Sequence, residues 1–113
     1  MKLAVVGSRT FNDYDLLKRS LEVIPNITEI VSGGAKGADS LAEKWAFEHA
    51  INITIFKPDW EKEGLAAGFI RNKLIVDHCD KVIAFWDGKS KGTAHSISLA
   101  EKAHKECIII RGA

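Results

Sequence analysis

Short runs of apolar residues recur along the chain and alternate with longer stretches in which apolar residues return every three or four positions. A short continuous apolar run is typical of a strand covered on both faces, and the longer spacing is typical of an amphipathic helix. The strands predicted on this basis are residues 2–6, 28–31, 52–56, 81–86 and 107–110. The predicted helices are residues 13–24, 38–50, 65–79 and 94–104.

The regular alternation of strands and helices predicts an α/β fold. We expect one Rossmann-like, doubly wound domain over residues 1–113, with about five parallel strands, right-handed crossovers and helices on both faces. The segment 38–50 has the most regular helical period and carries Trp45 on its apolar stripe, which places this side chain in the core. Ligands bind such sheets beyond the carboxyl ends of the strands. Residues that follow the strands are therefore the candidates for chemistry.

The turn after the first strand contains Gly7, Ser8 and Arg9. Gly7 permits a sharp turn or the close approach of a ligand, and Arg9 can form a two-pronged pair with a phosphate. A tight turn with a solvent-exposed arginine is the alternative.

The turn after the second strand, residues 32–39, reads Ser-Gly-Gly-Ala-Lys-Gly-Ala-Asp. Such a turn can present successive backbone N–H groups to an anion, and we expect those from Gly33 to Gly37 to receive a phosphate. The glycine spacing matches neither Walker A nor GxGxxG, which disfavours the standard triphosphate and dinucleotide interpretations. Asp39 is expected to accept from a sugar hydroxyl or a base; a first-turn carboxylate favoured by the helix dipole is the alternative.

The turn after the fourth strand, residues 87–93, reads Asp-Gly-Lys-Ser-Lys-Gly-Thr. Gly92 and Thr93 are candidates for a second phosphate-binding helix start, with Ser90 as a hydroxyl donor. The alternative is a flexible loop in which Thr93 caps the helix.

Further candidates lie within the helix expected at residues 65–79 and on either side of it. Arg71 can serve a ligand or a partner, and Asn72 lies one turn beyond Gly68 on the same side. Trp60 and Trp86 follow strands and can stack on a base, with packing in the core or in a dimer interface as the alternative. Of the four histidines, only His95 is placed where it can face the pocket.

Composition narrows the class of protein. A chain of 113 residues with 46% hydrophobic and 27% charged residues can bury its own core. Sixteen basic and fifteen acidic residues give a net charge of +1, so we disfavour a nucleic-acid partner.

No apolar run reaches the ~20 residues of a membrane helix, and no signal-peptide pattern is present, so we expect no membrane partner and a cytoplasmic location. Cys79 and Cys107 are expected as buried thiols, with a disulfide or a zinc site as the alternative; we assign no metal and no cofactor.

Taken together, these residues resemble the SLOG superfamily, a Rossmann-like group that contains the LOG-type phosphoribohydrolases and the Rossmann domain of DprA/Smf. Within it, the chain is most similar to small bacterial and phage proteins related to YspA and YpsA. The matching motifs are spread over nearly the whole chain: Gly7-Ser8-Arg9, Ser32-Gly33-Gly34-Ala35, Gly37-Ala38-Asp39, Trp60, Gly68, Arg71-Asn72, Phe85-Trp86-Asp87-Gly88, Ser90 and Gly92-Thr93. The resemblance implies a nucleotide-derived small molecule as ligand, held by the glycine-rich loops, and a homodimer.

The chain departs from the LOG-type pattern at the residue that serves cleavage. Those enzymes carry Pro-Gly-Gly-x-Gly-Thr-x-x-Glu, and the corresponding count from Thr93 reaches Ser96. We therefore favour ligand binding, as a sensor or sequestering protein, over N-glycosidic hydrolysis, for which Asp39 and Asp87 are the catalytic candidates. Single-stranded nucleic-acid binding is the least favoured hypothesis. The expected ligand-binding residues are Gly7, Ser8, Arg9, Ser32, Gly33, Gly34, Gly37, Asp39, Trp60, Arg71, Asn72, Trp86, Gly88, Ser90, Gly92 and Thr93.

Overall fold

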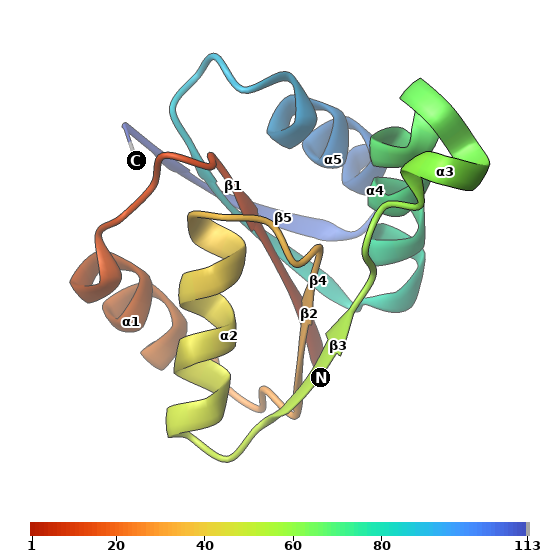
Figure 1. Cartoon of the computed structure of the whole chain (residues 1–113). Coiled ribbons are helices and arrows are strands. Elements are labelled where there is room, and N and C mark those ends of the chain that lie inside the picture. Colours follow the sequence, from red (N-terminus) through yellow and green to blue (C-terminus); the bar gives the residue numbers. More distant parts are fainter. Residues whose placement is uncertain (113) are drawn as a thin grey trace.

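A computed structural model describes residues 1–112 as a five-stranded sheet flanked by helices (Figure 1). The strands lie in the order β3-β2-β1-β4-β5, and every neighbouring pair is parallel. This arrangement confirms the expected α/β Rossmann-like class. The strands are β1 (Lys2–Gly7), β2 (Glu29–Ser32), β3 (Asn52–Ile55), β4 (Lys81–Trp86) and β5 (Glu106–Arg111).

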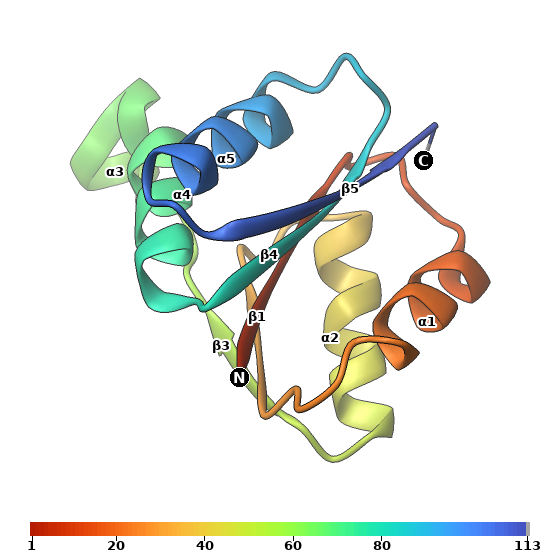
Figure 2. The ribbon, with the colours of Figure 1, turned by 180° about the vertical axis from the view of Figure 1, so that it is seen from behind.

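The helices cover both faces of the sheet, with α1 and α2 on one face and α4 and α5 on the other (Figures 1 and 2). β1 shows why, because Leu3 and Val5 pack in the core under the first pair while Ala4 and Val6 pack under the second. A strand buried on both faces needs the continuous apolar run seen in the sequence. The helices are α1 (Tyr14–Glu22), α2 (Ala38–Glu48), α3 (Trp60–Glu63), η1 (Gly64–Ala66), α4 (Ala67–His78) and α5 (Lys91–Lys102).

Two helices differ from the sequence expectation. α5 begins at Lys91 rather than at residue 94, because Ser90 is its N-cap and its Oγ accepts the N–H of Thr93 at 3.4 Å. Gly92 and Thr93 therefore lie inside the first turn. The four-residue helix α3 was not expected; Asp59 caps it by accepting the N–H of Lys62 at 3.1 Å.

The expected core residues lie where the pattern placed them, with one partial exception. Trp45 is buried, as predicted for its helical stripe. Cys79 is buried and Cys107 is partly buried, and both are free thiols. Burial raises the pKa of both, that of Cys107 to about 11, so both thiols stay protonated at neutral pH. Within residues 1–112, no helix has the length and apolar character that crossing a membrane requires.

The strand order reverses between β1 and β4, and the chain leaves both strands at the same edge of the sheet (Figure 1). Two hydrogen bonds hold these exits together. The N–H of Ser8 donates to the Phe85 carbonyl at 3.1 Å, and the N–H of Asp87 donates to Ser8 Oγ at 3.3 Å. Sheets of this class bind their ligands at such a reversal.

Candidate functional site

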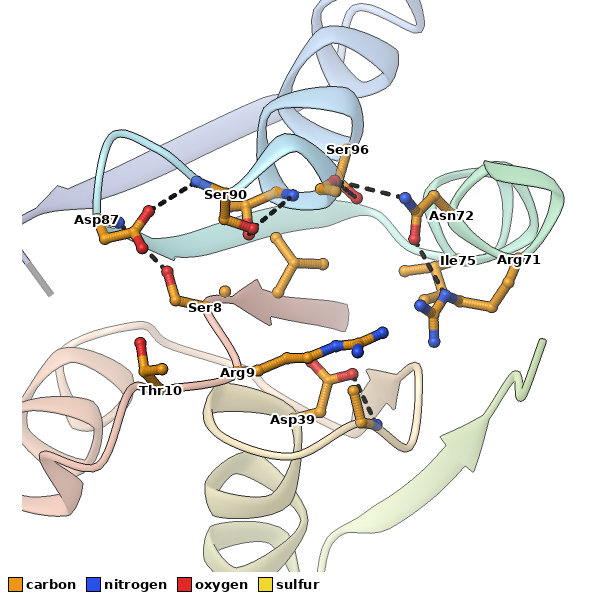
Figure 3. Close-up of a pocket in the computed structure, with 15 residues that line it drawn as sticks. Ser8, Arg9, Thr10, Asp39, Arg71, Asn72, Ile75, Asp87, Ser90 and Ser96 are labelled. Atoms are coloured by element: carbon orange, nitrogen blue, oxygen red, sulfur yellow. Dashed lines mark hydrogen bonds between the residues drawn. The ribbon is translucent and has the colours of Figure 1, made fainter. Parts of the chain in front are cut away.

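A cavity of about 370 Å³ opens at the carboxyl ends of β1 and β4, and we call it the inner pocket (Figure 3). Five segments contribute to it: the end of β1 with the turn that follows, the turn after β2, the start of α2, the middle of α4, and the turn into α5 with the first turns of that helix. Its lining residues are Val6, Gly7, Ser8, Arg9, Thr10, Ala35, Asp39, Arg71, Asn72, Ile75, Asp87, Ser90, Gly92, Thr93 and Ser96.

The turn after β1 forms the back of the inner pocket. A Cβ at Gly7 would lie 2.6 Å from both the Ala38 Cβ and the Phe85 carbonyl oxygen, so packing alone requires glycine there. Ser8 is buried and its hydroxyl holds the exit of β4. Arg9 is exposed and its side chain extends along the pocket toward α4 (Figure 3).

The glycine-rich turn after β2 is closed on the protein's own carboxylate. Asp39 Oδ2 accepts the N–H of Gly33 at 3.2 Å and that of Ala35 at 3.1 Å. The N–H of Gly34 donates to Ser32 Oγ at 3.2 Å. Three of the backbone groups that we expected to receive a phosphate thus already have partners. Gly33 and Ala35 have this partner because Asp39, in the first turn of α2, lies within reach of the turn that precedes it.

Asp39 is a buried acid with one oxygen free for another contact. Burial raises the pKa of Asp39 above its usual value, although the Ala35 N–H, the charge of Arg71 and the Gly33 N–H work in the opposite direction. Oδ2 accepts both backbone bonds, and no hydrogen bond among residues 1–112 uses Oδ1. This free oxygen can meet a hydroxyl inside the inner pocket.

Arg71 reaches from α4 to the turn after β2. Its Nη1 donates to the Gly33 carbonyl at 2.7 Å, and its Nε donates to Asn72 Oδ1 at 3.0 Å. A side chain at Gly33 would occupy the same space as this guanidinium, which explains the glycine. Burial is the main reason that the pKa of Arg71 is lowered; Asp39 raises it and the like charge of Arg9 lowers it further.

Arg9 and Arg71 point toward one another across the opening of the inner pocket (Figure 3). Arg9 follows β1, and Arg71 lies on α4. The ion pairs formed within residues 1–112 are Lys73–Asp77, His78–Glu29 and Lys81–Glu106, so neither arginine has a carboxylate partner at ion-pair distance. Two converging guanidinium groups without such a partner form a positive site suited to a phosphate.

The turn from β4 into α5 supplies neutral polar groups. Ser90 Oγ lies 3.0 Å from Thr93 Oγ1, and Ser96 Oγ donates to the Gly92 carbonyl at 3.2 Å. Thr93 and Ser96 are buried in the wall of the inner pocket. Ser96 was not among the expected ligand-binding residues, although it occupies the position at which LOG-type enzymes carry glutamate.

Asp87 shapes this turn from its exposed side. Its Oδ1 accepts the N–H groups of Lys89 and Ser90, each at 2.8 Å. These bonds, that of Ser90 first, hold the pKa of Asp87 below its usual value. Asp87 is therefore ionised and already serves as the acceptor for its own loop.

Asn72 joins the two helices that line the pocket. Its Nδ2 lies 3.4 Å from the Gly92 carbonyl and 3.3 Å from His95 Nδ1. An amide nitrogen donates, so His95 Nδ1 is the acceptor, in keeping with a pKa that burial lowers. His95 is not among the lining residues of the inner pocket.

A second cavity of about 440 Å³ adjoins the first, and we call it the outer hollow. The two cavities share Arg9, Ala35 and Arg71. The outer hollow is lined by Arg9, Gly33, Gly34, Ala35, Lys36, Pro58, Trp60 and Arg71.

The structure does not bring all the expected residues to these cavities. Trp60 lines the outer hollow, but the indole N–H of Trp86 donates to the Ser90 carbonyl at 3.1 Å and its ring lies under Arg111. The expected residues that line neither cavity are Ser32, Gly37, Trp86 and Gly88. The lining residues that sequence reasoning did not select are Val6, Thr10, Ala35, Lys36, Pro58, Ile75 and Ser96.

Residues 1–62 of the chain match the family described as the YspA, cpYpsA-related SLOG family. The Gene 61 protein of Mycobacterium phage D29 is 35% identical over 112 residues, which covers 90% of each chain. The chain belongs to the YspA, cpYpsA-related SLOG family. The resemblance that the motifs indicated is thereby confirmed.

Solved structures share the fold of this SLOG-family chain. DNA processing protein A (DprA) from Streptococcus pneumoniae matches with a TM-score of 0.83 and 21% identity, over 99% of this chain and 50% of that one. DprA from Helicobacter pylori matches with a TM-score of 0.76 and 24% identity, over 96% of this chain and 64% of that one. The SLOG-family chain thus spans only part of either protein.

The Helicobacter pylori structure is described by its single-stranded DNA binding mode. This finding overturns our expectation that a nucleic-acid partner is disfavoured. The expectation rested on a net charge of +1, and a net charge says nothing about local clusters such as Arg9, Lys36 and Arg71 at the outer hollow.

Proposed function

We propose that this SLOG-family protein binds a nucleotide or nucleotide-derived ligand in the inner pocket, as a sensor or sequestering protein. The convergence of Arg9 and Arg71 on one opening carries the proposal. A phosphate between them takes charge-assisted hydrogen bonds from both guanidinium groups and relieves the repulsion between their like charges.

The other lining residues suit the rest of a nucleotide. Asp39 Oδ1 is free to accept from a sugar hydroxyl, and the hydroxyls of Ser90, Thr93 and Ser96 offer neutral polar contacts. Ile75 adds an apolar side chain to the lining on the α4 side. A few placed polar groups around an apolar patch are typical of small-molecule sites.

The geometry favours binding over N-glycosidic cleavage. Asp87 is exposed and uses Oδ1 to hold its own loop, and Asp39 uses Oδ2 to hold the turn after β2. Both carboxylates thus stabilise the backbone of a turn. If the protein is nevertheless a hydrolase, its mixture with a nucleoside monophosphate releases free base, and Asp39→Asn or Asp87→Asn abolishes the release while binding survives.

Single-stranded DNA is a second candidate ligand. The observation that favours it is the likeness to Helicobacter pylori DprA, together with three cations and an exposed tryptophan at the outer hollow. Binding of a strand through several phosphates falls steeply as salt rises, by a slope of roughly 0.7 per phosphate contact on logarithmic axes. Binding of a mononucleotide depends on salt much less.

The deciding experiment compares AMP with adenosine by calorimetry, on the wild type and on Arg9→Ala. One charge-assisted contact is worth about 1.5–3 kcal/mol, so we expect Arg9→Ala to weaken AMP binding by about tenfold or more and adenosine binding hardly at all. Arg9→Lys keeps the charge but loses the two-pronged geometry, so its affinity for AMP should lie between that of the wild type and that of Arg9→Ala. Arg19→Ala, on the remote helix α1, is the control. Equal losses for AMP and adenosine in Arg9→Ala contradict the phosphate role.

Three further expectations remain predictions: a single domain over residues 1–113, a homodimer and a cytoplasmic location. Sedimentation of the purified chain with and without AMP tests the dimer, because two chains that complete one pocket associate more tightly when the ligand is present.

A further inference from the structure

We propose that the outer hollow is a second ligand subsite and that the ligand contains two linked nucleotide units. One unit occupies the inner pocket, and the base of the second stacks on Trp60. The inference rests on the proposed function and adds to it the size and charge of the ligand.

The charges lining the outer hollow differ from those of the inner pocket. Arg9, Lys36 and Arg71 line the outer hollow, and within residues 1–112 no acidic side chain does so. The inner pocket has Asp39 and Asp87 beside the same two arginines. The outer hollow therefore favours an anion, which points to a second phosphate group.

Trp60 gives the outer hollow a flat apolar wall. The side chain is 52% exposed, although tryptophan is ordinarily among the largely buried residues. Gly68 on α4 lies beside the ring, and a Cβ there would be in ordinary van der Waals contact with Trp60 Cη2 at 3.6 Å. Pro58 lines the same hollow. An exposed indole beside three cations has the two elements of a nucleotide subsite, a stacking surface and a positive charge.

The two cavities are continuous at the arginines. Arg9, Ala35 and Arg71 line both, so a phosphate held by the two guanidinium groups lies at the junction. The cavities measure about 370 and 440 Å³, each near the lower end of the range of roughly 300–1,000 Å³ for small-molecule sites. Linked units fill both, whereas a mononucleotide leaves one open. Two adenosines joined by a pyrophosphate and a phosphodiester-linked dinucleotide share this chemistry.

The test measures three probes by calorimetry on the full chain: AMP, two adenosines joined by a pyrophosphate, and the 5′-phosphorylated dinucleotide of deoxyadenosine. We expect at least one dinucleotide to bind about tenfold or more tightly than AMP. Trp60→Ala and Lys36→Ala should each remove most of that gain and change AMP affinity by less than about twofold. Whichever of the two dinucleotides binds more tightly, the pyrophosphate-linked or the phosphodiester-linked one, shows which linkage the ligand contains.

Leu65→Ala is the matched control, because Leu65 is an exposed apolar residue of the same segment that lines neither cavity. It should leave all three affinities unchanged. A dinucleotide should also quench the tryptophan fluorescence of the wild type more than that of Trp60→Phe.

Two results overturn the inference: dinucleotides that bind no more tightly than AMP, or equal losses for AMP and dinucleotide in Trp60→Ala. In either case AMP binding that depends on Arg9 leaves the proposed function standing. Failure of AMP binding itself, with no effect of Arg9→Ala on any probe, is the distinct result that removes the proposed function.

Discussion

The turns after β2 and β4 look alike in sequence and differ in structure. Both are rich in glycine, and in both an aspartate oxygen accepts two backbone N–H groups of the turn. In the first turn the acid is Asp39, which belongs to α2, the helix that follows the turn, and is buried. In the second turn the acid is Asp87, which is the first residue of the turn and is exposed. The pKa of Asp39 is raised and that of Asp87 is lowered.

The comparison shows that a glycine-rich turn at a strand end need not be an open anion site. Here a carboxylate of the chain takes the N–H groups that a phosphate would otherwise receive. The turns then supply shape, and the positive charge comes from Arg9 and Arg71. The turn after β2 packs closely against neighbouring residues, whereas the turn after β4 has open space around it. The following substitutions test this difference.

The largest difference is expected between Gly37→Ala and Gly88→Ala. Both glycines have a positive φ, 78° and 81°. A Cβ at Gly37 would collide with the Ser8 carbonyl and lie 2.6 Å from that of Arg9, whereas a Cβ at Gly88 meets nothing within 4 Å. We expect Gly37→Ala to lower the free energy of unfolding by about 3 kcal/mol or more, and Gly88→Ala by about 1 kcal/mol. Urea unfolding measures both, and equal losses refute the contrast.

Removing the two acids gives the next largest difference. Asp39→Ala leaves the buried N–H of Gly33 and the part-buried N–H of Ala35 without their acceptor, which should cost about 2–4 kcal/mol of unfolding free energy. Asp87→Ala leaves the N–H groups of Lys89 and Ser90 exposed, where water replaces the carboxylate, so the loss is smaller. The same unfolding experiment compares them. A larger loss for Asp87→Ala is the contrary outcome.

The pH dependence of stability should have opposite signs for the two acids. The folded pKa of Asp39 is raised, so its contribution to stability decreases as pH rises from about 3.9, the unfolded value, through the folded value. The folded pKa of Asp87 is lowered, so its contribution is present above about 3.9 and is lost as pH falls through the folded value. Unfolding free energies of the wild type, Asp39→Asn and Asp87→Asn across this window reveal the slopes. Parallel curves for the wild type and Asp39→Asn speak against a perturbed Asp39.

The smallest effect is expected from the serine hydroxyls near the two turns. Ser90→Ala removes the N-cap of α5 and should cost about 1 kcal/mol of unfolding free energy. Ser40 Oγ donates to the Ala35 carbonyl at an exposed position, so Ser40→Ala should cost less than about 0.5 kcal/mol. Thermal unfolding of both variants, with circular dichroism to follow the helices, orders the two effects; a greater loss for Ser40→Ala reverses the assignment of the cap.

The sheet was predictable because its signal is local. All five strands were expected within a residue or two of their bounds, since each apolar run is short and ends near a polar or glycine residue. The start of α5 was misplaced because Ser90 and Thr93 are both cap-forming residues. The structure selects Ser90, whose N–H is held by Asp87.

The site was less predictable because its geometry depends on distant contacts. Arg71 was a candidate from its motif, but no local pattern shows that it reaches the carbonyl of Gly33, 38 positions earlier. The closure of the turn after β2 by Asp39 could not be inferred from the sequence, because an acid in the first turn of a helix is ordinarily explained by the helix dipole. The helix α3 has four residues and is too short to show a helical period, so the sequence did not indicate that Trp60 begins a helix.

The hydrogen bond between Ser8 and Asp87 joins residues 79 positions apart in the chain. During synthesis from the N-terminus, the turn after β1 emerges long before its partner exists, and the inner pocket cannot form until α5 has been made. Contacts of such high sequence separation form late in folding, because closing the long loop costs entropy before the contact repays it. A ligand that needs both turns therefore binds only after the chain has been made and folded as far as α5.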